Sequence, residues 1–265
     1  MENVESVYRK CFLVLSMKCL EALRKIQKEI DMEVQVLSYT KEPEKTCVVS
    51  MRSTRTLEPA HRLWNKDWMV ECPEKSEDLF SCPKDKQGRG QKCNRYDICA
   101  IRLIREAKKS KHWGVLEHAY YTVSVSGISR ACTHQLVRHR LFSYLQSSSR
   151  MIDFSKFTSK DFIVPPSIDK AGSRKGFSDF VDSAVQAYAG LKEKGVRKED
   201  ARFVLPEATS QHIVITGNAR NWLHFFYMRM SRSAQWEIRE LANAIHEKLM
   251  EISPEIFRGA GMLEC

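Results

Sequence analysis

A run of aromatic and β-branched residues, Ala119–Val125 (AYYTVSV), requires a β-strand in the middle of this chain. The run ends at Ser126-Gly127, a dipeptide that favours a turn. A second strand is indicated at Met32–Val36, where apolar and polar residues alternate with the period of a half-buried strand. A compact domain is expected to begin near Met32.

Helical spacing of apolar residues predicts several helices around these strands. The pattern covers about Val4–Ile30, Ile98–Lys109, Ser129–Arg140, Phe177–Lys194 and the long stretch Asn218–Ile252. Pro254 stops the last of these, because proline cannot continue a helix. The polar segment Ser143–Arg150 is interpreted as a loop, and Glu71–Asn94, which is rich in charge, Pro and Gly, as a surface loop or insertion.

This order of elements predicts an α+β architecture. Residues 1–31 are expected to form an N-terminal helical extension and residues 32–265 one domain, with a Cys-containing insertion at about 71–99. The insertion holds Cys72, Cys82 and Cys93, and Cys99 closes it, without the close Cys-x-x-Cys pairs of a zinc knuckle. No metal site is therefore predicted, although the sequence leaves open whether these thiols bind metal.

Charge and hydropathy restrict the partners of the chain. The 43 Lys and Arg residues against 33 Asp and Glu give a net charge of +10, which favours an anionic partner: nucleic acid, a phosphate-rich cofactor or a nucleotide. The longest apolar run near the N-terminus, Cys11–Leu15, is far below the roughly 20 residues of a membrane span, so no membrane association is expected. No small-residue cleavage site follows the opening residues, and a cytoplasmic location is predicted.

The segment Arg138–Arg150 is the strongest candidate for chemistry. It opens with Arg138, His139 and Arg140, and continues with serine hydroxyls, Gln146 and a further arginine. Adjacent helical residues project about 100° apart, so the first three side chains cannot all face one small ligand, but they can grip an extended one. Arginine offers a planar fork to phosphate or to a pyrimidine edge, and Ser and Gln add short neutral hydrogen bonds. A bound nucleotide suits this set of groups.

The segment resembles the flavin-dependent thymidylate synthases. Their motif is Arg-His-Arg followed by a serine three positions on, a serine eight on and an arginine ten on, which are here Ser143, Ser148 and Arg150. Further similar stretches are His112–His118, Gly127–Arg130, Thr133–Gln135, Asn218–Arg220, His224, Arg229 and Ala234–Arg239. The similarity runs from about Met32 to Phe257, so it covers most of the chain.

The resemblance implies a set of binding residues. FAD would be held by Arg138, His139, Arg140, Gln146, Asn218, Arg220 and His224. Deoxyuridylate (dUMP) would meet Gln135, Arg138, Gln146, Ser147, Ser148, Ser149, Arg150, Arg202 and Arg229. Arg229 is expected to be catalytic, because a permanently protonated guanidinium beside the uracil ring stabilises the negative charge that develops there.

The resemblance also implies the reaction. NADPH reduces FAD, and 5,10-methylenetetrahydrofolate provides the carbon that converts dUMP to dTMP, so that the cofactors carry the chemistry and the protein positions them. No protein nucleophile is required, and Ser148 is interpreted as a phosphate-binding hydroxyl. A mainly antiparallel sheet packed with long helices is implied, as is a homotetramer with active sites shared between subunits.

Some positions depart from the family pattern. Gly114 stands where the family often has a hydroxyl side chain that contacts FAD, and Met151 stands where a tyrosine is common. The stretch Val49–Thr54 matches an early arginine-containing segment only loosely. These departures leave the individual contacts at those positions open.

Other functions compete with this one. A related flavoenzyme that transfers another one-carbon group to a pyrimidine nucleotide would use the same residues. The charge of +10 also suits a nucleic-acid-binding protein, but no helix-turn-helix, zinc-finger or aromatic sheet motif is present, so nucleic acid is not the expected partner. A thymidylate synthase with a cysteine nucleophile is disfavoured, because Cys132 lacks the surrounding motif of that class.

Several residues have structural interpretations. Glu117 and His118 are either a buried pair beside a strand or cofactor contacts, and His212 is expected to be a structural histidine with its hydrogen bonds satisfied. Core packing is predicted for the aromatic side chains Phe225, Phe226 and Trp236. An exposed helix end is predicted for Lys108, Lys109 and Lys111.

Overall fold

The structure, a computed structural model, describes residues 31–66, 68 and 99–262 of the chain. The predicted helix Val4–Ile30 and the predicted loop with Cys72, Cys82 and Cys93 lie outside these ranges. Two compact units are present: one contains Ser148–Ser210, and the other consists of Met32–Ser147 and Gln211–Cys265. The predicted division into residues 1–31 and 32–265 stays a prediction.

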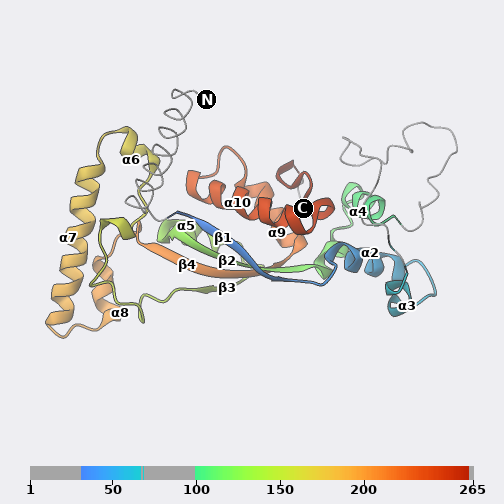
Figure 1. Ribbon diagram of the computed structural model, residues 1–265, viewed down its shortest axis with the longest axis horizontal. Coiled ribbons are helices and arrows are strands. Elements are labelled where there is room, and N and C mark those ends of the chain that lie inside the picture. The colour runs from blue at the N-terminus through green and yellow to red at the C-terminus, as the bar shows by residue number, and fades with distance from the viewer. Residues whose placement is uncertain (1–30, 67, 69–98, 263–265) are drawn as a thin grey trace, which may run out of the picture. The chain divides into compact units, whose positions relative to one another are not determined.

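The larger unit is built on a four-stranded sheet in the order β1-β2-β4-β3 (Figure 1). The strands are β1 Glu33–Tyr39, β2 Tyr120–Ser129, β3 Ser143–Gln146 and β4 Ser210–Asn218. Pairing is antiparallel between β1 and β2 and between β3 and β4. In β2, Tyr121, Val123 and Val125 are fully buried, because alternate side chains of a strand face the same side.

Two helices lie over one face of this sheet, α9 (Ala219–Arg229) and α10 (Trp236–Ile252) (Figure 1). Trp222, Phe225 and Phe226 of α9 are fully buried in the same core as the apolar side chains of β2. This confirms the predicted packing of both phenylalanines, whereas Trp236, the first residue of α10, is only half-buried.

The single long helix predicted for Asn218–Ile252 is wrong. The chain leaves the helix after Arg229 and starts again at Trp236, where the Gln235 side chain accepts hydrogen bonds from the N–H groups of Glu237 and Ile238. A side-chain cap of this kind satisfies donors that have no partner within a helix. The apolar periodicity continues across the break, which is why the pattern alone did not reveal it.

The remaining elements of the larger unit are short. They are α2 Pro43–Ser53, α3 Ala60–Trp64, α4 Ala100–Lys109, η3 Trp113–His118, α5 Arg130–Leu136, α11 Pro254–Phe257 and η6 Ala260–Met262. The helix predicted for Ser129–Arg140 is thus shorter than expected. It begins after Ser129, whose Oγ accepts a hydrogen bond from the N–H of Cys132, and it ends at Leu136.

Part of the predicted loop Ser143–Arg150 is a strand, so that interpretation is wrong for β3. Pairing with β4 overrides the local polar composition, since backbone hydrogen bonding does not depend on side-chain polarity. The Tyr144 hydroxyl strengthens the arrangement by donating to the carbonyls of Leu136 and His139, at 2.7 and 3.0 Å. The turn that carries the Arg-His-Arg sequence is thereby fastened to the sheet.

Lys108 is 2% exposed, so the predicted exposed helix end is wrong at this position. Its Nζ donates to the carbonyls of Glu255, Ile256 and Arg258, and Arg105 beside it binds the Glu255 carboxylate through Nε and Nη2. Burial lowers the pKa of Lys108 to about 8. Lys108, which the sequence predicted to be exposed, is therefore buried and binds the C-terminal segment through hydrogen bonds.

The smaller unit contains the long helix α7 (Arg174–Glu193), which confirms the helix predicted for Phe177–Lys194. The other elements are η4 Ser159–Asp161, α6 Pro166–Lys170, α8 Lys198–Ala201 and η5 Arg202–Val204. Phe154, Tyr188 and Ala201 form one buried cluster, and Phe162, Val181 and Val185 form another. The two units together give the α+β class that was predicted. None of the described helices is both long enough and apolar enough to cross a bilayer.

Candidate functional site

The centre of the candidate site in the larger unit is a hydrogen bond between Arg229 and His139. Arg229 is the last residue of α9, and His139 lies in the turn between α5 and β3. The Nε of Arg229 donates to Nε2 of His139 at 2.9 Å. Burial, and then the positive charge of Arg229 and the proximity of His224, lower the pKa of His139 to about 4. The imidazole is therefore neutral at neutral pH and accepts through Nε2.

His139 also lies among rings of α9. Its ring centroid is 6.2 Å from that of His224 and 5.1 Å from that of Phe225. The Nδ1 atom of His224 is buried and has no hydrogen-bond partner among the described residues. A buried polar atom without a partner is costly, so this nitrogen is a candidate contact for a bound ligand.

Two arginines flank His139 in the sequence and point a positive charge outward. Arg138 and Arg140 are both exposed, while His139 between them is half-buried. Neither guanidinium forms a hydrogen bond or ion pair with any residue in the described ranges. The structure thus agrees with the inference that the three side chains do not face one small ligand, and it leaves two cations available beside the buried imidazole.

A network of amide and hydroxyl groups surrounds Gln146. Its Nε2 donates to Oγ1 of Thr133 at 3.2 Å and to Oε1 of Gln211 at 3.0 Å, and Ser147 Oγ donates to the same Gln211 oxygen at 3.0 Å. Gln211 was not predicted as a site residue. Its position in β4 is the signal that could have revealed it. Gln211 is polar, yet it lies on the same side of the strand as the buried Ile213 and Ile215. Gln135 is half-buried near the end of α5.

The start of α9 carries two more of the predicted cofactor residues. Asn218 caps the helix, since its Oδ1 accepts from the N–H of Asn221 at 3.0 Å. Arg220 is exposed and forms an ion pair with Glu117, at 2.5 Å between Nη1 and Oε1. Glu117 is therefore not half of a buried pair with His118, which is itself exposed. His212 is exposed as well, so its predicted structural role is wrong.

The smaller unit holds the remaining predicted residues. Ser149 is buried, and its Oγ accepts from Nη1 of Arg202 at 2.8 Å. Arg150 is exposed and binds the carboxylate of Glu199. A cleft of about 440 Å³ in this unit is lined by Ser148, Arg150, Met151, Arg197, Lys198 and Glu199. The last three were not predicted, although the run Arg197–Arg202 is visibly rich in charge.

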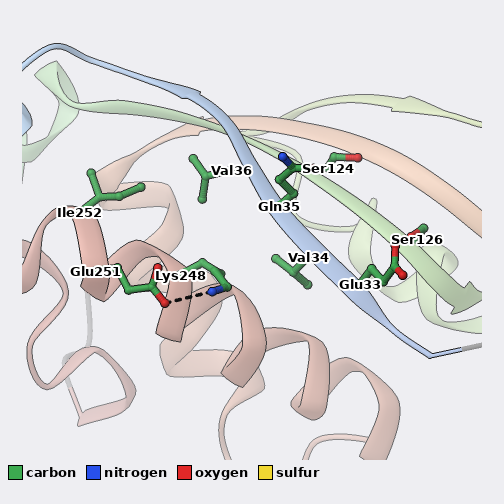
Figure 2. Close-up of a pocket in the computed structure, with 9 residues that line it drawn as sticks. All are labelled: Glu33, Val34, Gln35, Val36, Ser124, Ser126, Lys248, Glu251 and Ile252. Carbon is green, nitrogen blue, oxygen red and sulfur yellow. Dashed lines mark hydrogen bonds and ion pairs between the residues drawn. The ribbon is translucent and has the colours of Figure 1, made fainter. Parts of the chain in front are cut away.

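A second cavity, of about 510 Å³, lies in the larger unit between β1 and α10 (Figure 2). Val34 and Val36 line it from β1, and the ion pair of Lys248 and Glu251 lines it from α10. None of the residues predicted to bind FAD or dUMP belongs to this cavity. It is therefore separate from the candidate site.

Cysteine and metal chemistry receive no support from the described residues. Within residues 31–66, 68 and 99–262, no group of three or more His, Cys, Asp or Glu could hold a metal ion. Cys132 is fully buried, and burial raises the pKa of its thiol, with the Glu237 carboxylate adding to the effect. A buried protonated thiol is a poor nucleophile, so the surroundings of Cys132 do not favour nucleophilic catalysis by this residue.

Comparisons with known proteins identify the family. The model of the family described as thymidylate synthase complementing protein matches residues 35–255. A flavin-dependent thymidylate synthase of Sulfolobus acidocaldarius is 35% identical over 236 residues, which cover 87% of this chain and 77% of that protein. One of Geobacter sulfurreducens is 44% identical over 151 residues, or 57% of this chain and 65% of that protein.

Solved structures share the fold. A crystal structure of the UMP/dUMP methylase PolB from Streptomyces cacaoi, bound with 5-Br dUMP, has a TM-score of 0.65 at 20% identity and covers 86% of this chain and 93% of its own. Thymidylate synthase X from Helicobacter pylori, with FAD and dUMP, has a TM-score of 0.61 at 21% identity and covers 88% and 100%. With the sequence matches, these likenesses show that the chain belongs to the flavin-dependent thymidylate synthase family.

Proposed function

We propose that this protein catalyses the reductive methylation of dUMP to dTMP, with FAD as bound cofactor and with NADPH and 5,10-methylenetetrahydrofolate as co-substrates. The observation that carries the proposal is the hydrogen bond between Arg229 and His139 in a chain that matches the family along residues 35–255. It joins the residue expected to be catalytic to the centre of the family motif.

The larger unit has groups that suit FAD. Among the described residues, Arg138 and Arg140 have no partner for their guanidinium groups and the buried Nδ1 of His224 has none either, so the former suit phosphate oxygens and the latter a ligand donor or acceptor. Asn218 and Arg220 add an amide and a third guanidinium, which is paired with Glu117, at the start of α9. We propose that these residues, with His139 and Gln146, hold FAD, which supplies the hydride chemistry when bound. Gly114 is exposed and contributes no hydroxyl.

Arg229 is well placed to act on a pyrimidine. Its partner His139 is a neutral imidazole and not a carboxylate, so the positive charge of the guanidinium is not cancelled. Only Nε is used in that bond, and no other described residue binds the guanidinium, so both terminal nitrogens keep their N–H groups for a substrate carbonyl. A fixed cation that faces a developing oxyanion stabilises the transition state more than the ground state. This is the role we assign to Arg229.

We assign the remaining residues to the nucleotide. Ser148, Ser149, Arg150 and Arg202 suit its phosphate, because they combine hydroxyl groups with guanidinium forks. Gln135, Arg138, Gln146 and Ser147 suit the base and sugar, whose edges both donate and accept hydrogen bonds. A cytoplasmic homotetramer whose subunits share active sites completes the proposal.

An anaerobic assay tests this function directly. Purified protein is incubated with FAD, dUMP, methylenetetrahydrofolate and NADPH, and dTMP is followed by chromatography for the parent, Arg229→Ala and Arg229→Lys. Formation of dTMP by the parent and a loss of roughly 10²-fold or more in Arg229→Ala would support both the reaction and the arginine's role. A protein that binds no FAD would refute the proposal.

A different one-carbon reaction on a pyrimidine nucleotide is the second candidate. The shared fold with a protein described as a UMP/dUMP methylase makes UMP the second nucleotide to test. The same assay with UMP in place of dUMP, and with product masses measured, distinguishes the two. A methylated UMP product, or a hydroxymethyl product, would replace the first candidate with the second.

A further inference from the structure

We propose that Glu199 positions Arg150 for the phosphate of the nucleotide, an inference that rests on the proposed function. In the smaller unit, Arg150 approaches the Glu199 carboxylate with two nitrogens, Nε at 3.0 Å and Nη2 at 2.8 Å, and both meet Oε2. Charge-assisted hydrogen bonds of this geometry fix the plane of a guanidinium. Glu199 was not among the residues that the family motif suggests.

The pairing leaves the end of Arg150 free. A guanidinium has five N–H donors, and Glu199 engages the side formed by Nε and one N–H of Nη2. Within the part of the chain that the structure describes, no other acceptor binds this guanidinium, so both N–H groups of Nη1 and the second of Nη2 remain for an anion. The exposures agree, since the side chain of Arg150 is 62% exposed and that of Glu199 only 24%. Both residues line the cleft, and the more exposed arginine presents its remaining N–H groups there.

Glu199 is itself held in place from several directions. Its other carboxylate oxygen, Oε1, is 2.5 Å from Nη2 of Arg197. Its backbone carbonyl accepts from Nε of Arg202, the residue whose Nη1 also donates to Ser149. Lys198 donates to the carbonyl of Met151 at 3.2 Å. The segment around Glu199 thus forms hydrogen bonds with the residues on both sides of Arg150, Ser149 and Met151.

Charge in the cleft suits a phosphate monoester. Arg150, Arg197 and Lys198 line it together with a single carboxylate, that of Glu199. The positive charge therefore exceeds what the carboxylate neutralises, and a dianion would restore balance. Arginine in a fixed orientation loses less side-chain freedom when it binds such a group than a freely rotating arginine does. Glu199 acts through Arg150 and is a positioning residue, not a catalytic one.

The test separates phosphate binding from binding of the rest of the nucleotide. Dissociation constants of dUMP and of deoxyuridine, which lacks the phosphate, are measured by calorimetry on the FAD-loaded protein. We expect Glu199→Gln to reduce the preference for dUMP over deoxyuridine about tenfold, and to leave the deoxyuridine constant within about twofold. A structural effect would change both constants together. Glu199→Asp keeps the carboxylate and is expected to restore part of the preference.

The matched control is Asp169→Asn in the same unit. Asp169 pairs with Arg174 at 3.0 Å, and both are well exposed, but neither lines the cleft. This variant is expected to keep the parental preference. Arg150→Lys, which keeps the charge but lacks the fork, is expected to lower the preference and to make it insensitive to an added Glu199→Gln.

Two results for Glu199→Gln would overturn the inference. An unchanged preference in Glu199→Gln would mean that Arg150 needs no support, and an increased preference would mean that Glu199 competes with the phosphate. A parent protein that binds dUMP no better than deoxyuridine would instead refute the phosphate assignment in the proposed function, and the inference with it. Melting temperatures of all variants confirm that the folded protein is compared.

Discussion

Arg229 and His139 are 90 positions apart in the chain, yet the Nε of the arginine donates to the Nε2 of the histidine at 2.9 Å. The bond joins the end of α9 to the turn that precedes β3. It requires the imidazole to be neutral, because a protonated ring has no acceptor. His139 is therefore more than a neighbour of the proposed cofactor: it fixes the direction in which Arg229 points.

His139→Leu is expected to lower kcat about tenfold to hundredfold in the FAD-loaded protein, because an unrestrained Arg229 spends less time in the productive orientation. His139→Gln can still accept a hydrogen bond through Oε1 and should retain more activity. The measurement is kcat and KM for dUMP, with FAD content determined for each variant. Equal kcat values for the parent and the Leu variant would contradict the positioning role.

Gly217→Ala should destabilise the larger unit by about 1–3 kcal/mol, the cost of forcing an extra group into a packed core. A Cβ at this position would lie 2.5 Å from Cε1 of Phe142 and closer still to Cδ1. Gly190→Ala is the control: nothing lies within 4 Å of a Cβ there, and a helical alanine is favoured over glycine by roughly 0.5–1 kcal/mol. Urea denaturation of both variants tests whether Gly217→Ala lowers the free energy of unfolding and Gly190→Ala raises it. A Gly217→Ala variant with the same denaturation midpoint as the parent would show that Phe142 moves aside.

Glu44→Gln should make stability less dependent on pH. Burial raises the pKa of Glu44 from 4.5 to about 7, so its contribution to stability is complete below about 4.5 and is lost as the pH rises through 7. Glutamine carries no charge and its Oε1 can still accept from the N–H of Glu255, as Glu44 does at 2.8 Å. The variant should exceed the parent by about 2 kcal/mol at pH 8 and by little at pH 5.

The measurement is the free energy of unfolding in urea at both pH values, with the exposed Glu33→Gln as control. In that control, the free energy of unfolding should change between the two pH values as it does in the parent. If the free energy of unfolding of Glu44→Gln also changed with pH as in the parent, Glu44 would not be responsible for the loss of stability at high pH.

Cys132→Ala should leave dTMP formation within about threefold of the parent, because no cysteine nucleophile acts in the proposed reaction. The thiol is fully buried and protonated, and its loss should cost about 1 kcal/mol of stability through lost packing. Cys47→Ala, at an equally buried free cysteine, is the matched control. Activity lost from a folded Cys132→Ala, but not from Cys47→Ala, would point to thiol chemistry.

Local sequence patterns predicted much of the fold. The aromatic and β-branched run Ala119–Val125 became β2, and the alternation after Met32 became β1, because strand period and turn residues are properties of neighbouring positions. The strand β3 was missed, since its four residues lie in a polar segment and pair only because β4 lies beside them. The break between α9 and α10 was missed as well, because apolar spacing continues through it.

The sequence by itself determined the family, through the spacing of Arg138–Arg150, and it named the residues proposed to bind cofactor and nucleotide. Only the tertiary structure decided their partners. Hydrogen bonds join Lys108 to the carbonyl of Glu255, Arg229 to His139, and Gln146 to Gln211. Each pair is far apart in the sequence. Periodicity and composition describe one segment at a time, whereas a hydrogen bond between distant side chains exists only once packing has brought their segments together.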